Sequence, residues 1–218
     1  KIFTKIIKEI TISARLAGGD LSANPRLRKA VSNAKSNNMP NDKIDRAIKK
    51  GTGELDGVIY EEITYEGYGP GGVAIIMDVI TDNKNRSVAD IRHILTKYKG
   101  NLGESGSVSW IFEKKGQIIL SSKLNDENIV FESALEAGAE DFETDDDIFI
   151  ISTAPESLMQ IRDTLESKGY DISSAEIEMV PKTLQKLEGK ESDIALELLN
   201  VLEDNDDVNK LYSNFYFD

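Results

Sequence analysis

The order of helices and strands in residues 117–180 is the feature that most restricts how this chain can fold. Hydrophobic periodicity predicts strands at 117–121, 140–144, 148–152 and 174–180. Amphipathic helices are predicted at 125–137 and 155–168. The order β-α-β-β-α-β is that of the ferredoxin-like split unit, and it is complete within about seventy residues. We therefore expect this segment to form a compact unit of its own.

The segments on either side of this unit are predicted to form one discontinuous domain. Residues 58–66, 73–80 and 107–113 are predicted strands, and 87–98 is a predicted helix. After Pro181, one helix at 192–203 and one strand at 208–215 have no partners of their own. Because they would complete the earlier β-β-α-β group, we expect the ferredoxin-like unit to be inserted into a middle domain.

The first fifty residues have the pattern of three short amphipathic helices. Apolar side chains recur at helical spacing, and Gly18-Gly19 interrupts the first run. Asn24-Pro25 predicts the start of the second helix, and Gly51 predicts the end of the third. Such short helices bury their apolar stripes only by packing together, which predicts a three-helix bundle.

Together these elements predict an α+β protein of three domains. A basic helical bundle is expected at 1–53, a discontinuous α+β middle domain at 54–113 plus 187–218, and the inserted ferredoxin-like domain at 114–186. A chain of 218 residues with 39% hydrophobic and 30% charged residues can bury two or three small cores.

Charge is distributed unevenly along the chain. The net charge is −13, yet residues 1–50 hold 12 Lys and Arg against 4 Asp and Glu. Residues 51–218 hold the other 14 basic residues against 35 acidic ones. This polarity suggests separate functions for the two parts. The alternative is a chance excess of lysines on solvated helix faces.

The basic residues of the first segment are predicted to lie on helix faces away from the apolar stripes. Lys43, Arg46 and Lys50, for example, follow one another at i, i+3 and i+7. Cations in that position can contact phosphates, which positions a nucleic acid without reading its bases. The single aromatic residue here, Phe3, does not indicate base stacking. The predicted nucleic-acid-binding residues are Lys1, Lys5, Lys8, Arg15, Arg26, Arg28, Lys29, Lys35, Lys43, Arg46, Lys49 and Lys50.

The glycine-rich segment Gly67-x-Gly69-x-x-Gly72 formally matches a dinucleotide-binding fingerprint. It precedes a strand instead of a helix, so no helix N-terminus is available for a pyrophosphate. We interpret it as a turn. Its exposed glycines would also allow close backbone approach to a partner, so Tyr68, Gly69, Pro70, Gly71 and Gly72 form a candidate contact loop.

The remaining residues with catalytic potential do not form a recognisable site. His93 shares one helix with Ser87 and Asp90, which is a poor arrangement for a relay, so a surface or capping role is favoured. The run Asp145-Asp146-Asp147 lacks the spaced ligands of a calcium loop and is interpreted as a solvated turn. A metal-dependent enzyme that uses these carboxylates is the weaker alternative. The sequence predicts no enzyme, cofactor, metal or small-molecule substrate.

The expected location of the protein is the cytoplasm. The absence of cysteine excludes disulfides and thiolate chemistry and is typical of a reducing compartment. No apolar run approaches the roughly 20 residues of a membrane helix, and no signal-peptide pattern is visible, so no membrane partner is expected.

Several stretches of the chain together resemble the YebC/PmpR family, which includes mitochondrial translational activators. The stretches are residues 1–5, 24–28, 38–53, 65–72, 81–86, 101–108, 136–141, 175–179 and 204–208. The similarity runs essentially end to end. Small departures are Lys99 in place of the first of two glycines, and Ser87 where threonine is common.

The resemblance implies the same three-domain fold and a non-enzymatic role in bacterial gene expression. It also implies a basic tail of about twenty residues ahead of Lys1. Many members of the family are described as DNA-binding transcriptional regulators, and others are similar to translation factors that act at the ribosome. A DNA-binding transcriptional regulator is the first expectation here. The alternative is a ribosome-associated factor that binds ribosomal RNA through the same basic helices.

Overall fold

The computed structural model describes residues 2–218, which divide into two compact units. One unit contains the chain up to Trp110 together with Leu184–Asp218, and the other is Ile111–Thr183. The fold is α+β, with an N-terminal helical bundle, a discontinuous middle domain and an inserted ferredoxin-like domain, as predicted. The bundle and the middle domain belong to the same compact unit. The predicted boundaries at residues 53, 113 and 186 stay a prediction.

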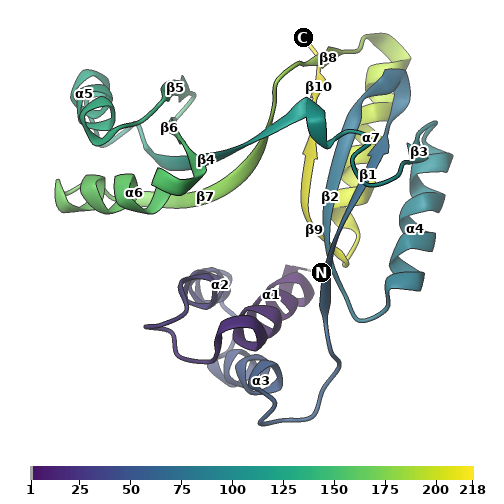
Figure 1. Ribbon diagram of the computed structural model, residues 1–218, viewed down its shortest axis with the longest axis horizontal. Helices are drawn as coiled ribbons and strands as arrows, with labels where there is room; N and C mark the ends of the chain where they lie inside the picture. Colours follow the sequence, from purple (N-terminus) through teal and green to yellow (C-terminus); the bar gives the residue numbers. More distant parts are fainter. Residues whose placement is uncertain (1) are drawn as a thin grey trace. The chain divides into compact units, whose positions relative to one another are not determined.

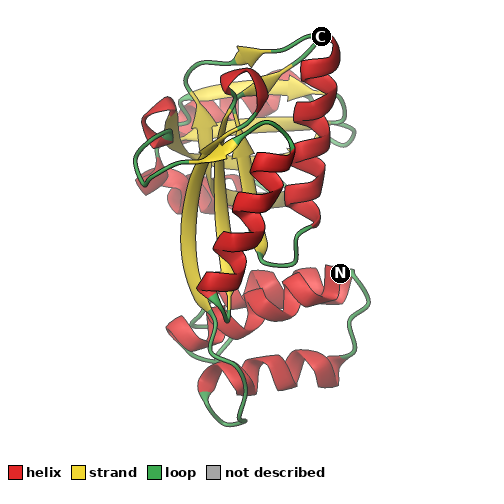
Figure 2. Cartoon of the chain, turned by 90° about the vertical axis from the view of Figure 1, so that its right-hand side faces the viewer, coloured by secondary structure: helices red, strands yellow, loops and turns green. Residues whose placement is uncertain are grey.

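The bundle consists of α1 (Ile2–Ala17), α2 (Pro25–Ser36) and α3 (Asn41–Thr52), the three helices at the bottom of Figure 2. The Asn24 side chain accepts a hydrogen bond from the Leu27 N–H at 3.1 Å, which caps α2 as its sequence predicts. Apolar residues of all three helices form one core, including Ile10, Leu27 and Ile44. The amphipathic pattern of the sequence therefore becomes mutual packing.

The third helix continues past Gly51, where the sequence predicted its end. A Cβ atom at Gly51 would lie 2.4 Å from the carbonyl oxygen of Thr11 on α1. Glycine at this position therefore allows α3 to approach α1 closely. The helix ends at Thr52, and Gly53 follows with a positive φ of 85°.

The middle domain is a sheet with the strand order β3-β1-β2-β9 (Figure 1). These strands are β1 (Glu61–Tyr68), β2 (Ala74–Thr81), β3 (Asn101–Leu102) and β9 (Val208–Ser213), and all their pairings are antiparallel. The helices α4 (Lys84–Lys97) and α7 (Gly189–Asp204) cover one face, where Leu95 and Leu198 pack on Ile75 and Met77 of β2. The strand β9 therefore completes the sheet that begins with β1 and β2, and α7 covers it.

The predicted strand at 107–113 is wrong for residues 107–111, and only Phe112 and Glu113 lie in a strand, which belongs to the inserted unit. The side-chain carboxylate of Glu66 on β1 accepts hydrogen bonds from the backbone N–H groups of Gly106, Val108 and Ser109. Because these amides bond to a side chain, they are not available for a strand ladder. The edge of the sheet is formed instead by the two-residue strand β3, which pairs with the end of β1.

The inserted unit has the predicted order β-α-β-β-α-β. It comprises β4 (Phe112–Ser121), α5 (Glu127–Ala137), β5 (Asp141–Asp145), β6 (Ile148–Thr153), α6 (Leu158–Ser167) and β7 (Ile172–Pro181). The strand order is β5-β6-β4-β7 with antiparallel pairing throughout. Ile118 and Ile151 of the sheet share a core with Val130 and Leu165 of the two helices. The first strand is ten residues long and lies wholly in this unit.

Short elements connect these parts. Three 3-10 turns are present at Pro70–Gly72, Ser109–Ile111 and Pro155–Ser157 in the described chain. The strands β8 (Gln185–Lys186) and β10 (Phe215–Tyr216) form a parallel pair. Within residues 2–218, each helix is too short or too polar to cross a membrane.

Candidate nucleic-acid interface

The cations of α2 and α3 point away from the bundle core. Each of these helices buries an apolar stripe, which leaves the opposite side in solvent. The exposed cations on the two helices are Arg28, Lys29, Lys35, Lys43, Arg46, Lys49 and Lys50. Because α2 contains no Asp or Glu, its surface carries positive charge without a compensating carboxylate on the same helix.

Two of these exposed cations are held by contacts within the bundle. Arg28 donates from Nη1 to the carbonyl oxygens of Leu21 at 2.9 Å and Ser22 at 3.4 Å. The Lys43 Nζ lies 5.7 Å from the centre of the Phe3 ring. Such contacts restrict the side chains while leaving them at the surface, which lowers the entropy lost when a phosphate binds.

The third helix presents a basic side and a mixed side. Lys43, Arg46 and Lys50 lie along one line of the helix. Lys49 lies on the other side and lines a shallow pocket together with the carboxylate-bearing residues Asp20, Asp45 and Glu54. Three nearby carboxylates oppose the approach of a phosphate. Lys49 is therefore less suited to the predicted role than its neighbour Lys50.

The cations of α1 are directed toward the middle domain. Lys5 donates from Nζ to the main-chain carbonyl of Glu203, and burial lowers the pKa of Lys5. Arg15 is exposed and donates from Nη1 to the carbonyl oxygen of Tyr60 at 2.6 Å. Lys1 lies outside the described residues. The described cations on this side of α1 thus contact the protein itself.

Arg26 at the start of α2 is also engaged internally. Its Nε and Nη2 atoms donate to the two carboxylate oxygens of Glu9 at 2.7 and 3.0 Å. Its Nη2 also donates to Glu62 on β1 at 2.5 Å. The hydrogen bonds that Arg26 donates to Glu9 raise the pKa of Arg26 above its usual range despite partial burial. This guanidinium links α2 to α1 and β1, so the expected phosphate contact is not available in this arrangement.

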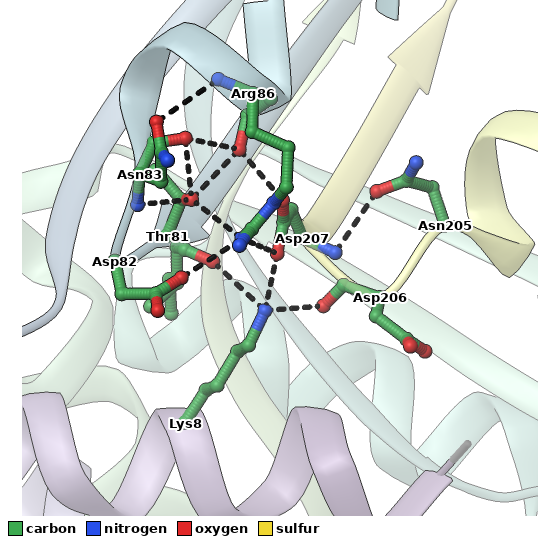
Figure 3. Close-up of polar contacts among 10 residues, drawn as sticks. Lys8, Thr81, Asp82, Asn83, Arg86, Asn205, Asp206 and Asp207 are labelled. Atoms are coloured by element: carbon green, nitrogen blue, oxygen red, sulfur yellow. Dashed lines mark hydrogen bonds and ion pairs between the residues drawn. The ribbon is translucent and has the colours of Figure 1, made fainter. Parts of the chain in front are cut away.

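The prediction that Lys8 lies on an outward basic surface is wrong. Only 7% of this residue is exposed. As Figure 3 shows, the ammonium group points from α1 into a cluster of polar groups on the middle domain. The Lys8 Nζ lies 2.5 Å from Asp207 Oδ1 and donates to the carbonyl oxygens of Ile80 at 3.3 Å and Asp206 at 3.0 Å. The side of α1 that carries Lys8 therefore faces Asp207 instead of solvent.

Asp207 is the centre of this cluster, which brings together the end of β2, the start of α4 and the start of β9. Ser87 donates from Oγ to Asp207 Oδ2 at 2.6 Å, and Arg86 approaches the same oxygen at 3.2 Å. Ser87 also bonds to Thr81 at 2.7 Å. Burial would raise the pKa of Asp207, but hydrogen bonds from Lys8 and Ser87 outweigh it and hold the pKa below its ordinary value. The carboxylate therefore stays charged and fixes α1 to the middle domain.

No local feature of the sequence indicates this cluster. Lys8 and Asp207 are 199 positions apart, and neither belongs to a motif with a known charge partner. The acidic stretch 204–208 is one of those that resemble the family, and the resemblance gives Asp207 no role. A lysine in a helical stripe gives no local signal that its charge will be buried.

The candidate contact loop is only partly accessible. Gly69 and Pro70 are buried, whereas Gly71 and Gly72 are exposed with φ of 64° and 80°. A Cβ atom at Gly71 would lie 2.3 Å from a Leu187 side-chain atom and 3.4 Å from the carboxyl group of Glu191 on α7. The turn is packed against α7, and its exposed tip lies beside a carboxylate. This environment is unfavourable for a phosphate.

The other residues considered for chemistry lie at the surface. His93 is exposed on α4, in agreement with the predicted surface position. Asp145, Asp146 and Asp147 are exposed at the turn between β5 and β6, where Asp147 pairs with Lys123 at 2.8 Å. No group of three or more His, Cys, Asp or Glu side chains suited to a metal ion occurs among residues 2–218.

Both the N-terminal bundle and the rest of the chain match domain models of the same protein family. Residues 1–54 match the family described as the TACO1/YebC protein N-terminal domain, and residues 60–215 match the TACO1/YebC second and third domain. A probable transcriptional regulatory protein of Geotalea uraniireducens is 55% identical over 215 residues, covering 99% of this chain and 87% of that protein. One from Syntrophus aciditrophicus is 56% identical over 216 residues, covering 99% and 86%.

A solved structure is similar over the whole chain. The crystal structure of a conserved hypothetical protein from Aquifex aeolicus superposes with a TM-score of 0.89 at 44% sequence identity. The match covers 100% of this chain and 90% of that one.

Proposed function

Because the chain belongs to the TACO1/YebC family, whose bacterial relatives are named probable transcriptional regulatory proteins, we propose that it regulates gene expression by binding nucleic acid through α2 and α3. The role is non-enzymatic and cytoplasmic. The contact region is the α2–α3 cationic surface, which we define as Arg28, Lys29, Lys35, Lys43, Arg46 and Lys50.

The observation that carries this proposal is the outward position of those cations on two helices of a single rigid core. Phosphate contacts by Lys and Arg release counterions from the nucleic acid, which supplies most of the sequence-independent binding energy. The rest of the chain is strongly acidic and would repel the same partner. The charge-driven part of binding should therefore be centred on this surface and should weaken steeply with salt.

The names of the relatives favour DNA as the target. Ribosomal RNA bound through the same helices is the alternative, and the side chains support it. The exposed residues of α2 include cations and small polar groups, and those of α3 include cations together with Asp42 and Asp45. The cations suit phosphate contacts on either nucleic acid. RNA is often recognised by its shape and backbone, without a base code.

The proposal is tested by reversing four charges of the surface at once. The variant carries Arg28→Glu, Lys35→Glu, Lys43→Glu and Arg46→Glu. Its control carries Lys114→Glu, Lys123→Glu, Lys182→Glu and Lys190→Glu, which change the net charge equally at exposed sites outside the bundle. We expect the first protein to lose binding to both duplex DNA and ribosomes, and the control to retain most of it. Equal losses in the two proteins would contradict the proposal.

The two targets are separated by competition. The unmodified protein is sedimented with ribosomes in the presence of increasing duplex DNA. Co-sedimentation that survives an excess of DNA indicates the ribosome as the target. Release of the protein onto DNA indicates the duplex.

A further inference from the structure

The tryptophan of the chain lies exposed at the end of an ordered loop in the middle domain. Trp110 is the sole tryptophan in the sequence, and 66% of it is exposed. Single exposed apolar residues are common at protein surfaces and do not by themselves indicate a function. The difference here is that both the loop and the side chain are held in place.

The loop at 103–109 is fixed to β1 by one buried residue. Glu66 is 6% exposed, and its carboxylate accepts N–H groups of Gly106 at 2.6 Å, Val108 at 3.1 Å and Ser109 at 2.6 Å. Its main-chain carbonyl accepts a further bond from the Gly103 N–H at 2.8 Å. Burial would raise the pKa of Glu66, but the three backbone N–H groups hold it below its ordinary value. A charged, buried carboxylate is stable only while these donors remain in place.

The indole itself is held by the same loop. Trp110 donates from Nε1 to the carbonyl oxygen of Ser107 at 3.0 Å, and the Tyr68 hydroxyl donates to the same oxygen at 3.0 Å. The polar edge of the ring is therefore satisfied within the protein, and most of its apolar surface remains in solvent. An aromatic face restrained in this way loses little entropy when another flat group stacks on it.

Basic residues precede this loop in the chain. Lys97 ends α4, and Lys99 follows in the turn before β3; both are exposed. Lys99 has a positive φ of 61°. Two residues later, Asn101 pairs with Tyr68 of β1, whose hydroxyl donates to the carbonyl oxygen of Ser107 in the loop. An exposed ring, with exposed cations on a segment that is connected to its loop through Tyr68, matches the combination found at single-stranded nucleic-acid sites, where bases stack and the backbone is neutralised. Glu104 is the exposed acidic residue of the loop itself.

We propose that Trp110 is a stacking platform for an unpaired base of single-stranded nucleic acid, with Lys97 and Lys99 at the adjoining phosphates. This inference rests on the proposed function, because it gives the bound nucleic acid a second contact on the middle domain. The α2–α3 cationic surface supplies affinity without regard to base pairing. The Trp110 platform supplies a preference for unpaired over paired segments.

The single tryptophan makes the test direct, because its fluorescence reports this position alone. The full chain is titrated with a 12-nucleotide uridine RNA, a thymidine DNA of the same length and a blunt 12-base-pair DNA duplex, each also followed by anisotropy of an end label. We expect both single strands to quench the emission to a plateau and the duplex to bind without quenching. Trp110→Leu should bind the single strands roughly 5- to 150-fold more weakly, while Trp110→Phe should retain most of the affinity. Duplex affinity should be unchanged in both variants.

The outcomes distinguish this inference from the function on which it rests. If no oligonucleotide changes the anisotropy, the proposed function fails and the platform fails with it. If oligonucleotides bind but neither quench the emission nor distinguish Trp110→Leu from the unmodified chain, the platform alone is overturned. Quenching by ribosomal proteins freed of RNA, without quenching by oligonucleotides, would assign Trp110 to a protein contact and likewise overturn the proposal.

Discussion

Within the bundle, α1 differs from α2 and α3 in where its positive charges lie. All three helices are amphipathic and basic, yet α1 directs Lys5 and Lys8 against the middle domain, whereas the cations of α2 and α3 that follow Arg26 are exposed at the surface. A buried charge pair gives up hydration and is useful chiefly as a fixed contact. An exposed cation keeps its counterions and can exchange them for phosphate. The same residue type therefore serves attachment in one helix and is free to serve binding in the others.

This difference shows that the surplus of positive charge at 1–50 overstates the surface available for a partner. Arg26, like Lys8, is matched by acidic residues of its own chain. In a chain with a basic and an acidic part, some opposite charges will pair within the fold before an external ligand is considered. The proposed interface is therefore limited to the exposed cations of α2 and α3.

The largest effect is expected from removing the partner of Lys8. Asp207→Ala leaves a buried ammonium without its carboxylate, which should lower the free energy of unfolding by about 3 kcal/mol. Asp206→Ala is the matched control, because the Asp206 side chain is exposed and only its carbonyl contacts Lys8. That variant should stay within about 0.5 kcal/mol of the unmodified protein. Urea denaturation followed by circular dichroism measures both, and similar losses in the two would show that the cluster does not attach α1.

A smaller effect is expected in the dependence of stability on pH. The pKa of Asp207 is depressed in the folded protein, so its contribution is present above the unfolded value of 3.8 and is lost as the pH falls through the lower folded value. Unfolding free energies of the unmodified chain and Asp207→Asn should therefore converge as the pH falls below about 4. Carboxylates common to both proteins cancel in the difference. If the difference between the two unfolding free energies stays constant as the pH falls, Asp207 is not held charged by its neighbours.

The smallest effect separates two adjacent lysines of α3. Lys50→Gln removes a cation from the basic line, and Lys49→Gln removes one from the pocket lined by Asp20, Asp45 and Glu54. We expect the first change to reduce the salt dependence of duplex binding by about 0.9 in the log–log slope. The second should leave the slope nearly unchanged. Equal reductions would show that the whole exposed surface of α3 contacts phosphate.

Much of the fold was predictable because its signals are local. The helix start at Asn24-Pro25 and the strand and helix order of the inserted unit depend on periodicity and on turn residues that lie within a few positions. The strand predicted at 107–113 failed because its amides bond to Glu66, some forty residues earlier in the chain. The sequence of the loop itself does not indicate that its amides bond to a buried carboxylate far along the chain.

The candidate site was predictable in part for the same reason. Helical spacing correctly placed Lys43, Arg46 and Lys50 on an exposed line of α3. Spacing could not reveal that the corresponding side of α1 would face Asp207, because that requires the packing of the bundle on the middle domain. The exposed ring of Trp110 lies outside the basic segment, and its sequence position gives no sign that the side chain is exposed.

The central claim is that some cations of the bundle attach its helices to the protein while others bind nucleic acid. Its most direct test is the salt dependence of nucleic-acid affinity in two matched double variants. Lys43→Gln with Arg46→Gln removes two outward cations, and Lys5→Gln with Arg26→Gln removes two that contact the protein itself. We predict that the slope of log affinity against log salt becomes shallower by about 2 in the first variant and does not change in the second. Equal changes in the two slopes, or a larger change in the second, would contradict it.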